Sequence, residues 1–347
     1  MPVFSIRRRS FLGLAASVIT IVIITYLSAM PRLPNRPMEP HRGRTAPKPT
    51  QHTEETKKCQ AGYYPSKNDC EPCPKDHFSL PGWISCTPYL KCDEIRSNIR
   101  RVRHLASGGV KHVYLAEWNS YSVALNEAHA SKSDFAHDVA MLQMLTPHPR
   151  VNQPLGACGD LLVTQYHPLS SAEKINEVLG RDKYRKLDTV KTRFRLALDY
   201  VGVLDYLHGH SSLVMCDTND LGKTLSQYLI TEDLRLIVND LDALPSAKDK
   251  GIKCGHRQIF GDFVAPEELW PYSNKPFEDE EMPGYNEKTD IWKIPRVVEF
   301  LLGGSEESLK VLENLKGIHS KCKEKDPKER PTAKEVLESY KSTWINF

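Results

Sequence analysis

The sequence lacks an Asn-x-Ser/Thr triplet, lacks an internal repeat, and carries almost no excess of charge of either sign. Without the triplet, N-linked glycans are not expected. The 47 Lys and Arg residues nearly balance the 44 Asp and Glu residues, which leaves a net charge of +3. A small and evenly spread charge gives no indication of nucleic acid as a partner. With 40% hydrophobic and 26% charged residues, the chain can bury a core, so disorder throughout is excluded.

Cysteine is scarce over most of the 347 residues and concentrated in one short block. Five of the nine cysteines lie between Cys59 and Cys92, among Gly, Pro and aromatic residues, a composition typical of a small disulfide-bonded module. Cys70 and Cys73 also have the spacing of zinc ligands, so a zinc site is the alternative. The other four are Cys158, Cys216, Cys254 and Cys322. An odd total predicts at least one free thiol or intermolecular bond if no metal is bound.

Residues 11–30 contain no charged side chain and are mostly apolar. Twenty helical residues span about 30 Å, the thickness of the hydrocarbon core of a bilayer. Three arginines, residues 7–9, precede the run. We therefore predict a transmembrane signal anchor over residues 11–30, behind a short cytoplasmic tail of residues 1–10. A cleaved signal peptide is the alternative, but Tyr26 and Leu27 would occupy the −3 position of its cleavage site, where a small residue is needed.

The orientation of this anchor follows from the cysteines, because basic residues flank the apolar run on both sides. Disulfides form and persist in the secretory lumen or outside the cell. We therefore predict a single-pass type II protein of the endoplasmic reticulum membrane with a luminal body, and the Golgi as the alternative. Residues 31–57, with six prolines, are predicted to be a stem, and residues 58–95 a cysteine-rich luminal segment.

The remaining residues, 96–347, begin with strand patterns and continue with helical patterns. Apolar residues at helical spacing predict helices over 133–145 and 193–207. Short apolar runs between turn residues predict strands over 102–118, 121–125, 161–166, 227–230 and 234–238. A strand-rich first part and a helix-rich second part predict an α+β protein with two lobes.

Several segments of this body resemble, in order, the motif set of the protein kinase family. The resemblance is strongest to an atypical branch whose members phosphorylate O-linked mannose. It implies a bilobal protein kinase-like fold, with a small β-rich N-lobe and a helical C-lobe, preceded by the single transmembrane helix. The segments are residues 105–113, Val-Ala-Leu at 123–125, 206–217, Val-Asn-Asp-Leu-Asp-Ala-Leu at 238–244, 264–270, 288–294 and 326–332.

The resemblance implies that Asp217 is the catalytic base, which accepts the proton of the attacking hydroxyl group. Met215 and Cys216 replace the His and Arg that precede this Asp in the family, a change that affects the support of the loop. The alternative is that Asp217 is a loop residue that makes only a local turn.

The resemblance also implies a metal site for Mg²⁺ or Mn²⁺ bound with ATP. Asp240, directly after a predicted strand, takes the position of the metal-binding Asp. Gly222 stands where the second ligand, an Asn, is expected, so a longer loop would bring Gln227 to that position. Asp242 replaces a Gly and either adds a carboxylate or caps the following turn.

One departure from the family is a missing lysine. Asn126 follows Val-Ala-Leu, where the family has its phosphate-binding Lys. Lys111, in the glycine-containing loop with Gly108 and Gly109, can approach the same phosphates from the adjacent strand, as in kinases whose lysine is relocated in this way. The alternative is an exposed strand lysine.

The resemblance assigns supporting roles to other residues. Gln165 and His167 belong to the hinge, residues 164–167, where backbone groups would bind adenine. Asp138 fits the helix position that pairs with the lysine, but after the relocation this pairing is not required. Asp290 is expected to brace the loop of Asp217. Glu267 and Arg330 are expected to form a structural ion pair.

The function implied by the resemblance is ATP-dependent phosphorylation of the 6-hydroxyl of O-linked mannose, within a trisaccharide on α-dystroglycan. Two alternatives remain open from the sequence. A luminal pseudokinase scaffold that binds glycan without catalysis is suggested by Asn126 and Gly222. A cytoplasmic receptor-type kinase would follow if the topology were reversed.

Overall fold

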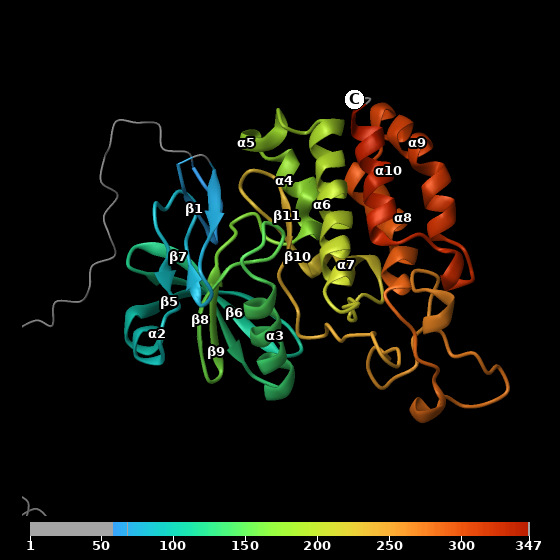
Figure 1. Cartoon of the computed structure of the whole chain (residues 1–347), viewed down its shortest axis with the longest axis horizontal. Helices are drawn as coiled ribbons and strands as arrows, with labels where there is room; N and C mark the ends of the chain where they lie inside the picture. Colours follow the sequence, from blue (N-terminus) through green and yellow to red (C-terminus); the bar gives the residue numbers. More distant parts are fainter. Residues whose placement is uncertain (1–57, 68, 346–347) are drawn as a thin grey trace, which may run out of the picture. The chain divides into compact units, whose positions relative to one another are not determined.

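The computed structural model describes residues 58–67 and 69–345. Within them the five-stranded sheet lies in one lobe with α2 and α3, and the other long helices lie in a second lobe with the short strands β10 and β11, as Figure 1 shows. The strands are β1 (Tyr63–Pro65), β2 (Cys70–Pro72), β3 (His77–Phe78), β4 (Thr87–Pro88), β5 (Ile99–Ser107), β6 (Lys111–Trp118), β7 (Tyr121–Ala128), β8 (Pro154–Cys158), β9 (Leu161–Gln165), β10 (Tyr228–Ile230) and β11 (Leu236–Val238). The α-helices are α2 (Cys92–Asn98), α3 (Lys132–Leu145), α4 (Ile175–Gly180), α5 (Asp182–Arg185), α6 (Val190–Gly209), α7 (Leu221–Ser226), α8 (Lys288–Leu302), α9 (Glu306–Cys322) and α10 (Ala333–Ile345). Short 3₁₀ helices cover Ala172–Lys174, Pro266–Glu268, Asp279–Glu281 and Pro327–Glu329.

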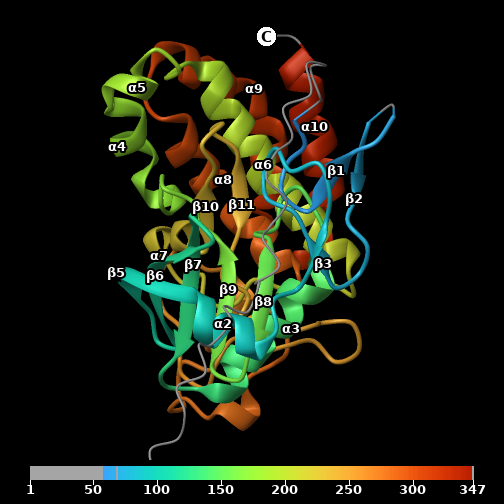
Figure 2. The same ribbon diagram turned by 90° about the vertical axis from the view of Figure 1, so that its left-hand side faces the viewer.

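The N-lobe is an antiparallel sheet of five strands in the order β5-β6-β7-β9-β8, which Figure 2 shows from the side with α2 in front and α3 beside the sheet. Successive side chains of a strand alternate between the two faces. Trp118 and Val123 therefore lie on one face, in a small core with Phe78 of the cysteine-rich segment (residues 58–95). Lys111 and Asn126 fall on the opposite face, which the register of β6 and β7 fixes.

The C-lobe is built around α6, whose 20 residues pack against α8 and α10. Thr189 caps its first turn by accepting a hydrogen bond from the amide of Thr192 at 3.2 Å. The buried side chains of α6 belong to the larger of the two hydrophobic cores. The predicted helices over 133–145 and 193–207 correspond to α3 and α6, because both have apolar residues at helical spacing along one buried stripe.

The cysteines form four disulfides among the described residues, which confirms the prediction of disulfides and contradicts the zinc alternative. Cys92 of the cysteine-rich segment forms its disulfide with Cys158 of β8, so this segment is tied covalently to the sheet. Cys322 is a free and buried thiol, as an odd number of cysteines requires. The pairs are Cys59–Cys70, Cys73–Cys86, Cys92–Cys158 and Cys216–Cys254.

The predicted fold class is corrected on one point. In residues 58–67 and 69–345 no helix is both long enough and apolar enough to cross a bilayer. The longest of these helices, α6, reaches 20 residues, but charged residues such as Arg193, Arg195 and Asp199 interrupt its apolar character. The transmembrane helix predicted over residues 11–30, and the predicted tail and stem around it, lie outside the described residues. Residues 58–67 and 69–345 form a two-lobed α+β fold.

Candidate active site

Lys111 of β6 is buried between the lobes, with 6% of its surface exposed. Its ammonium group forms an ion pair with Asp138 of α3 and a second one with Asp240, where Nζ lies 2.8 Å from Oδ1. Burial alone would lower the pKa of Lys111, but the charges of Asp138 and Asp240 raise it above its usual value. Lys111 is therefore a fixed buried cation and not an exposed strand lysine.

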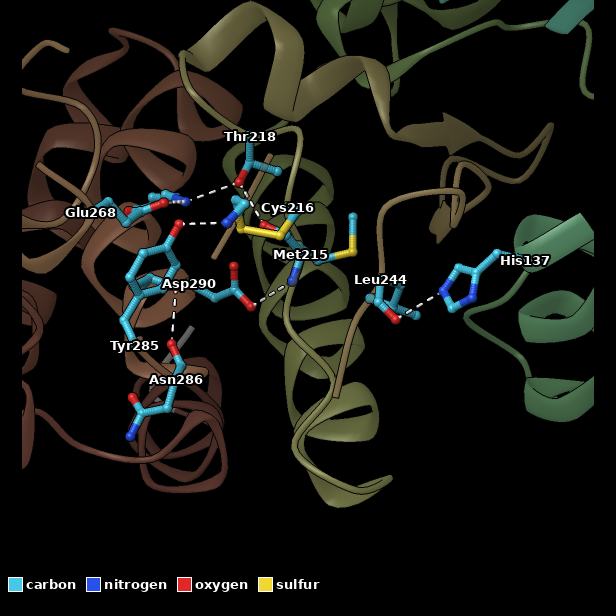
Figure 3. The surroundings of a disulfide bond; sticks show 12 residues. His137, Met215, Cys216, Thr218, Leu244, Glu268, Tyr285, Asn286 and Asp290 are labelled. Carbon is cyan, nitrogen blue, oxygen red and sulfur yellow. Dashed lines mark hydrogen bonds and ion pairs between the residues drawn. A yellow bond between two sulfur atoms is a disulfide. The ribbon is translucent and has the colours of Figure 1, made fainter. Parts of the chain in front are cut away.

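The pairing between this lysine and α3 is present, although the relocation of the lysine did not require it. Asp138 is fully buried and receives two donors, the Lys111 ammonium and the amide of Leu241, the latter at 3.0 Å. One residue earlier on α3, His137 Nε2 lies 3.1 Å from the carbonyl oxygen of Leu244, as Figure 3 shows. Helix α3 thus holds the segment that follows Asp240.

Asn126 occupies the place of the missing lysine and has a structural role. It is buried, and its Nδ2 donates to the carbonyl oxygen of Leu162 at 3.2 Å and to Thr164 Oγ1 at 3.4 Å. Both partners lie on the neighbouring strand β9. Asn126 therefore links β7 to β9. The positive charge of this region comes from Lys111.

Asp240 follows β11, as the strand-then-Asp pattern predicts, and its amide approaches the carbonyl oxygen of Gln227 at 3.4 Å. Apart from the ion pair with Lys111, its buried Oδ1 has no hydrogen-bond partner. Asp242 lies close to it. Burial, and after that the charge of Asp240, raise the pKa of Asp242 to about 7.

These carboxylates fit a divalent cation. Asp240 Oδ1 is paired with the Lys111 ammonium and has no hydrogen-bond partner besides it, so the carboxylate keeps lone pairs that can coordinate a metal, and a cation would relieve the repulsion between Asp240 and Asp242. Within the described residues, no three His, Cys, Asp or Glu side chains could hold a metal ion alone. Magnesium is usually bound by one or two carboxylates together with substrate phosphates, so this arrangement suits a metal that arrives with a nucleotide.

Asp217 lies in the loop 213–227 with its carboxylate 37% exposed. Its φ of 40° places it in the left-handed region, which costs a residue other than glycine about 1 kcal/mol. Lys223 Nζ lies 2.5 Å from Asp217 Oδ2, and although burial opposes it, this carboxylate raises the pKa of Lys223. Asp217 is therefore held in a strained backbone position with a cation beside it.

The extra length of this loop is folded into the short helix α7. Asp220 caps it by accepting a hydrogen bond from the amide of Lys223 at 2.8 Å, which turns Lys223 back toward Asp217. Gln227 follows α7 and is buried, with Nε2 3.3 Å from the carbonyl oxygen of Lys223 and 3.5 Å from that of Asp217. The predicted position of Gln227 at the end of a lengthened loop is thus observed, with its amide nitrogen directed at the loop.

Two buried anchors hold the loop from the C-lobe side. Asp290 Oδ2 accepts from the amide of Met215 at 3.1 Å, which confirms its predicted bracing role. Lys293 Nζ donates to Thr218 Oγ1 and to Glu268, each at 2.9 Å. Figure 3 shows Thr218, Glu268 and Asp290 around the loop.

The predicted structural ion pair of the C-lobe is present. Arg330 binds Glu267 through two nitrogen atoms, at 2.6 and 2.8 Å, and its side chain is fully buried. Such a bidentate pair holds the segment before α8 to the segment before α10.

The glycine-containing loop is the turn between β5 and β6. The amide of Gly108 donates to the carbonyl oxygen of Lys111 at 2.9 Å, which closes the turn, and Gly109 is exposed at its tip. A Cβ added at Gly109 would meet no other atom within 4 Å. The loop therefore offers open backbone directly before Lys111.

The hinge is partly engaged by the protein itself. The amide of Gln165 donates to the carbonyl oxygen of Gln153 at 2.9 Å, so this group is not free for a base. His167 is buried, which lowers its pKa to about 4, and its Nε2 lies 3.1 Å from Asn152 Oδ1. Asn152 Nδ2 in turn donates to Asn239 Oδ1 at 2.7 Å. This polar chain connects the hinge to the residue before Asp240, and no sequence motif indicated it.

A cavity of about 740 Å³ lies on another side of the hinge. Its walls come from the cysteine-rich segment, from Gln165, Tyr166 and His167, and from the turn between β10 and β11. Lys111, Asp217 and Asp240 are not among its lining residues. We therefore place the candidate chemistry at these three side chains and not in the cavity.

We expect the substitution Asp242→Asn to raise Tm at pH 7.5 by roughly 2–4 °C and to leave it unchanged near pH 4. The pKa of about 7 lies above the value of about 4 for an unfolded chain, so the folded protein keeps a proton that the unfolded protein releases. Stability therefore falls as pH rises from about 4 to 7, and the substitution removes this loss. Thermal unfolding at both pH values, without nucleotide or metal, measures the effect. Asp160→Asn, at an exposed turn, is the control; equal Tm values for Asp242→Asn and wild type at pH 7.5 would contradict the account.

No known family model matches the chain. It is similar to the human protein O-mannose kinase, with 46% identity over 279 residues, which cover 77% of this chain and 79% of the human protein. The chicken protein O-mannose kinase is 46% identical over 285 residues, and that of Xenopus laevis 43% over 292, with at least 79% of each chain covered. At this identity and coverage, the chain belongs to the protein O-mannose kinase family and is a phosphotransferase.

Proposed function

We propose that the chain transfers the γ-phosphoryl group of ATP to the 6-hydroxyl of an O-linked mannose, within a trisaccharide on α-dystroglycan. The name that its relatives carry supports a kinase acting on O-mannose. The observation that supports catalysis most directly is the ion cluster of Lys111 with Asp138 and Asp240, close to Asp217. Burying a lysine and two carboxylates is unfavourable unless they are paired, and a protein that only binds glycan does not require such a cluster.

In this proposal Asp217 accepts the proton of the mannose hydroxyl. Its carboxylate is partly exposed and so accessible to an acceptor. Lys223, at 2.5 Å from this carboxylate, places a positive charge beside it and beside the oxygen atoms of the transferred group. The strained backbone at Asp217 is consistent with a residue held for function.

Lys111, Asp240 and Gln227 would hold the phosphate and metal side of the site. A divalent cation bound with ATP would supply charge neutralisation at the phosphate oxygens. Asp240 offers it a carboxylate whose Oδ1 has no hydrogen-bond partner besides the ammonium of Lys111, and Asp242 is a further carboxylate beside it. Gln227 can contribute its side-chain oxygen, because its nitrogen is the atom directed at the loop.

For the nucleotide itself we propose the residues implied by the kinase resemblance. Gly108 and Gly109 present open backbone to the phosphates, and the hinge with Gln165 and His167 lies at the adenine end. Because the amide of Gln165 is engaged by Gln153, we assign the base to its carbonyl oxygen, which accepts from Asn152 Nδ2 at 3.5 Å. The scaffold alternative, suggested by Asn126 and Gly222, becomes an outcome of the assays below.

Asp217→Asn in the full chain should abolish transfer, lowering kcat by about 1,000-fold or more while nucleotide affinity stays within about two-fold. The amide cannot accept the proton of the hydroxyl group, but it keeps the size of the carboxylate. The assay incubates the protein with ATP, Mg²⁺ or Mn²⁺ and a panel of defined mannose-containing glycans, and follows phosphate on the sugar by mass and its position by NMR.

Asp160→Asn serves as the matched control, because Asp160 is exposed at the turn between β8 and β9. It should keep wild-type activity. A wild-type chain that binds the trisaccharide but never consumes ATP would establish the scaffold alternative, and phosphate on a hydroxyl other than the 6-hydroxyl would contradict the proposed regiochemistry.

A second test separates the structural and phosphate-binding roles of Lys111. Lys111→Met should lower the free energy of unfolding by about 3–5 kcal/mol, because it leaves the buried carboxylate of Asp138 and the partly buried one of Asp240 without their cation. Adding Asp138→Asn should recover part of this stability, since one of the two charges is then gone. Activity should stay at least about 100-fold below wild type in both variants, because the ammonium group is missing. Lys132→Met, at an exposed lysine, is the control; activity of the double variant that recovered with its stability would contradict a phosphate-binding role.

We also propose that the described residues function in the lumen of the endoplasmic reticulum. Their four disulfides support an oxidising compartment. In sealed microsomes, these residues should be protected from added protease until detergent opens the vesicles. Cleavage without detergent would indicate the cytoplasmic alternative, and protection in Golgi vesicles alone would place the chain there instead.

A further inference from the structure

The disulfide Cys216–Cys254 lies directly beside the proposed base. Cys216 immediately precedes Asp217 in the chain, and Cys254 belongs to the segment between Asp240 and Glu267. The bond therefore connects the loop 213–227 covalently to the segment that follows the metal-binding position. Figure 3 shows it in the centre of the hydrogen bonds around Met215 and Thr218.

The other anchors of the loop act on either side of Cys216 and Asp217. Met215 is held through its amide by Asp290 and through its carbonyl oxygen by Thr218 Oγ1, at 3.1 and 2.7 Å. The amide of Cys216 donates to the carbonyl oxygen of Ala243 at 3.1 Å. The disulfide adds the tie at the side chain next to the residue with φ of 40°.

The far end of the bond is fixed to the C-lobe. The amide of Cys254 donates to the hydroxyl group of Tyr285 at 2.7 Å. Ile252 and Tyr285 exchange two backbone hydrogen bonds, at 2.8 and 3.0 Å, and Tyr285 is buried with 6% of its surface exposed. Cys254 is therefore an anchor for Cys216 and not a mobile partner.

The position of Cys216 suggests what this bond replaces. In kinases an Arg commonly orders the corresponding segment by pairing with a phosphorylated side chain on it. In this chain Cys216 takes the position of the Arg that precedes the catalytic Asp in the family. Cys216 is connected to the equivalent segment by its covalent bond to Cys254. A covalent bond needs no prior phosphorylation, but it depends on the oxidation state of the two sulfur atoms.

We propose that Cys216 and Cys254 are positioning residues for phosphoryl transfer, whose disulfide holds Asp217 in its catalytic orientation and makes the activity sensitive to reduction. The inference rests on the proposed role of Asp217. A dithiol reductant would supply the electrons: the sulfur–sulfur bond breaks, each cysteine gains a hydrogen atom, and the dithiol becomes a disulfide. Reversing this step, by oxidation of the two thiols, restores the bond.

The double variant C216S/C254S tests the proposal in the full chain. We expect kcat to fall by about ten-fold or more, because a small displacement of a catalytic group is costly, while the KM values for ATP and for the glycan stay within about two-fold. The dissociation constant for ATP and the folded fraction, measured on the same preparation, exclude a loss through unfolding.

The matched control is C92S/C158S, which removes a disulfide of the N-lobe. It spans 66 residues, against 38 for Cys216–Cys254, so its contribution to stability through chain entropy is at least as large. It should lower Tm without lowering kcat of the folded protein. Equal kcat values for C216S/C254S and C92S/C158S would overturn the positioning role.

A combination with Asp217→Asn separates positioning from a general effect on structure. If the disulfide acts through Asp217, its removal should cause no further loss of kcat once the base is absent. A full additional ten-fold loss in the triple variant would contradict the inference. An inactive wild-type chain would instead contradict the proposed function, so the two failures are distinguishable.

Discussion

The buried ammonium group of Lys111 is the interaction on which the rest of this site depends. A cation with 6% exposure is stable only when negative partners compensate for its lost hydration, and Asp138 and Asp240 provide them from different parts of the fold. One side chain therefore fixes β6, helix α3 and the segment after β11 relative to each other. Burial of Asp242, and after it the charge of Asp240 in the same arrangement, raises the pKa of Asp242, and these carboxylates favour the cation that we infer.

A second buried lysine performs a comparable role in the C-lobe. Lys293 of α8 joins Glu268 and Thr218, and so connects the loop of Asp217 to the C-lobe. The site is thus assembled from two halves, each organised by a desolvated cation with few partners. Loss of one partner would leave a buried charge uncompensated, so substitutions at these positions are expected to affect folding as well as chemistry.

The sequence predicted those features that depend on local pattern or on spacing along a motif. Helices α3 and α6, the strand before Asp240 and the Glu267–Arg330 pair belong to this group. It did not predict α7 in the lengthened loop, although Asp220 is a recognisable capping residue.

The local pattern of the sequence did not predict contacts between residues that are far apart in the chain. The disulfide partners of Cys92 and Cys216 lie 66 and 38 residues away, and spacing alone does not decide such pairings. The persistence of the Lys111–Asp138 pair was also not predictable, because it depends on where the relocated lysine points after β6 and α3 have packed. No sequence motif indicates the hydrogen bonds that connect His167, Asn152 and Asn239, since a side-chain amide forms such links only in the folded protein.

The cysteine-rich segment has a consequence for where the folding unit begins. Phe78 of this segment packs on Trp118 of the sheet, with ring centres 5.8 Å apart, and helix α2 runs without interruption across residue 95. A fragment that started at residue 96 would cut α2, lose a covalent tie to β8 and expose the apolar outer face of the sheet to water. An uncovered face of this kind favours association between molecules. The sheet of the kinase-like body is therefore covered by the cysteine-rich segment. This segment precedes the first strand that any kinase motif would identify.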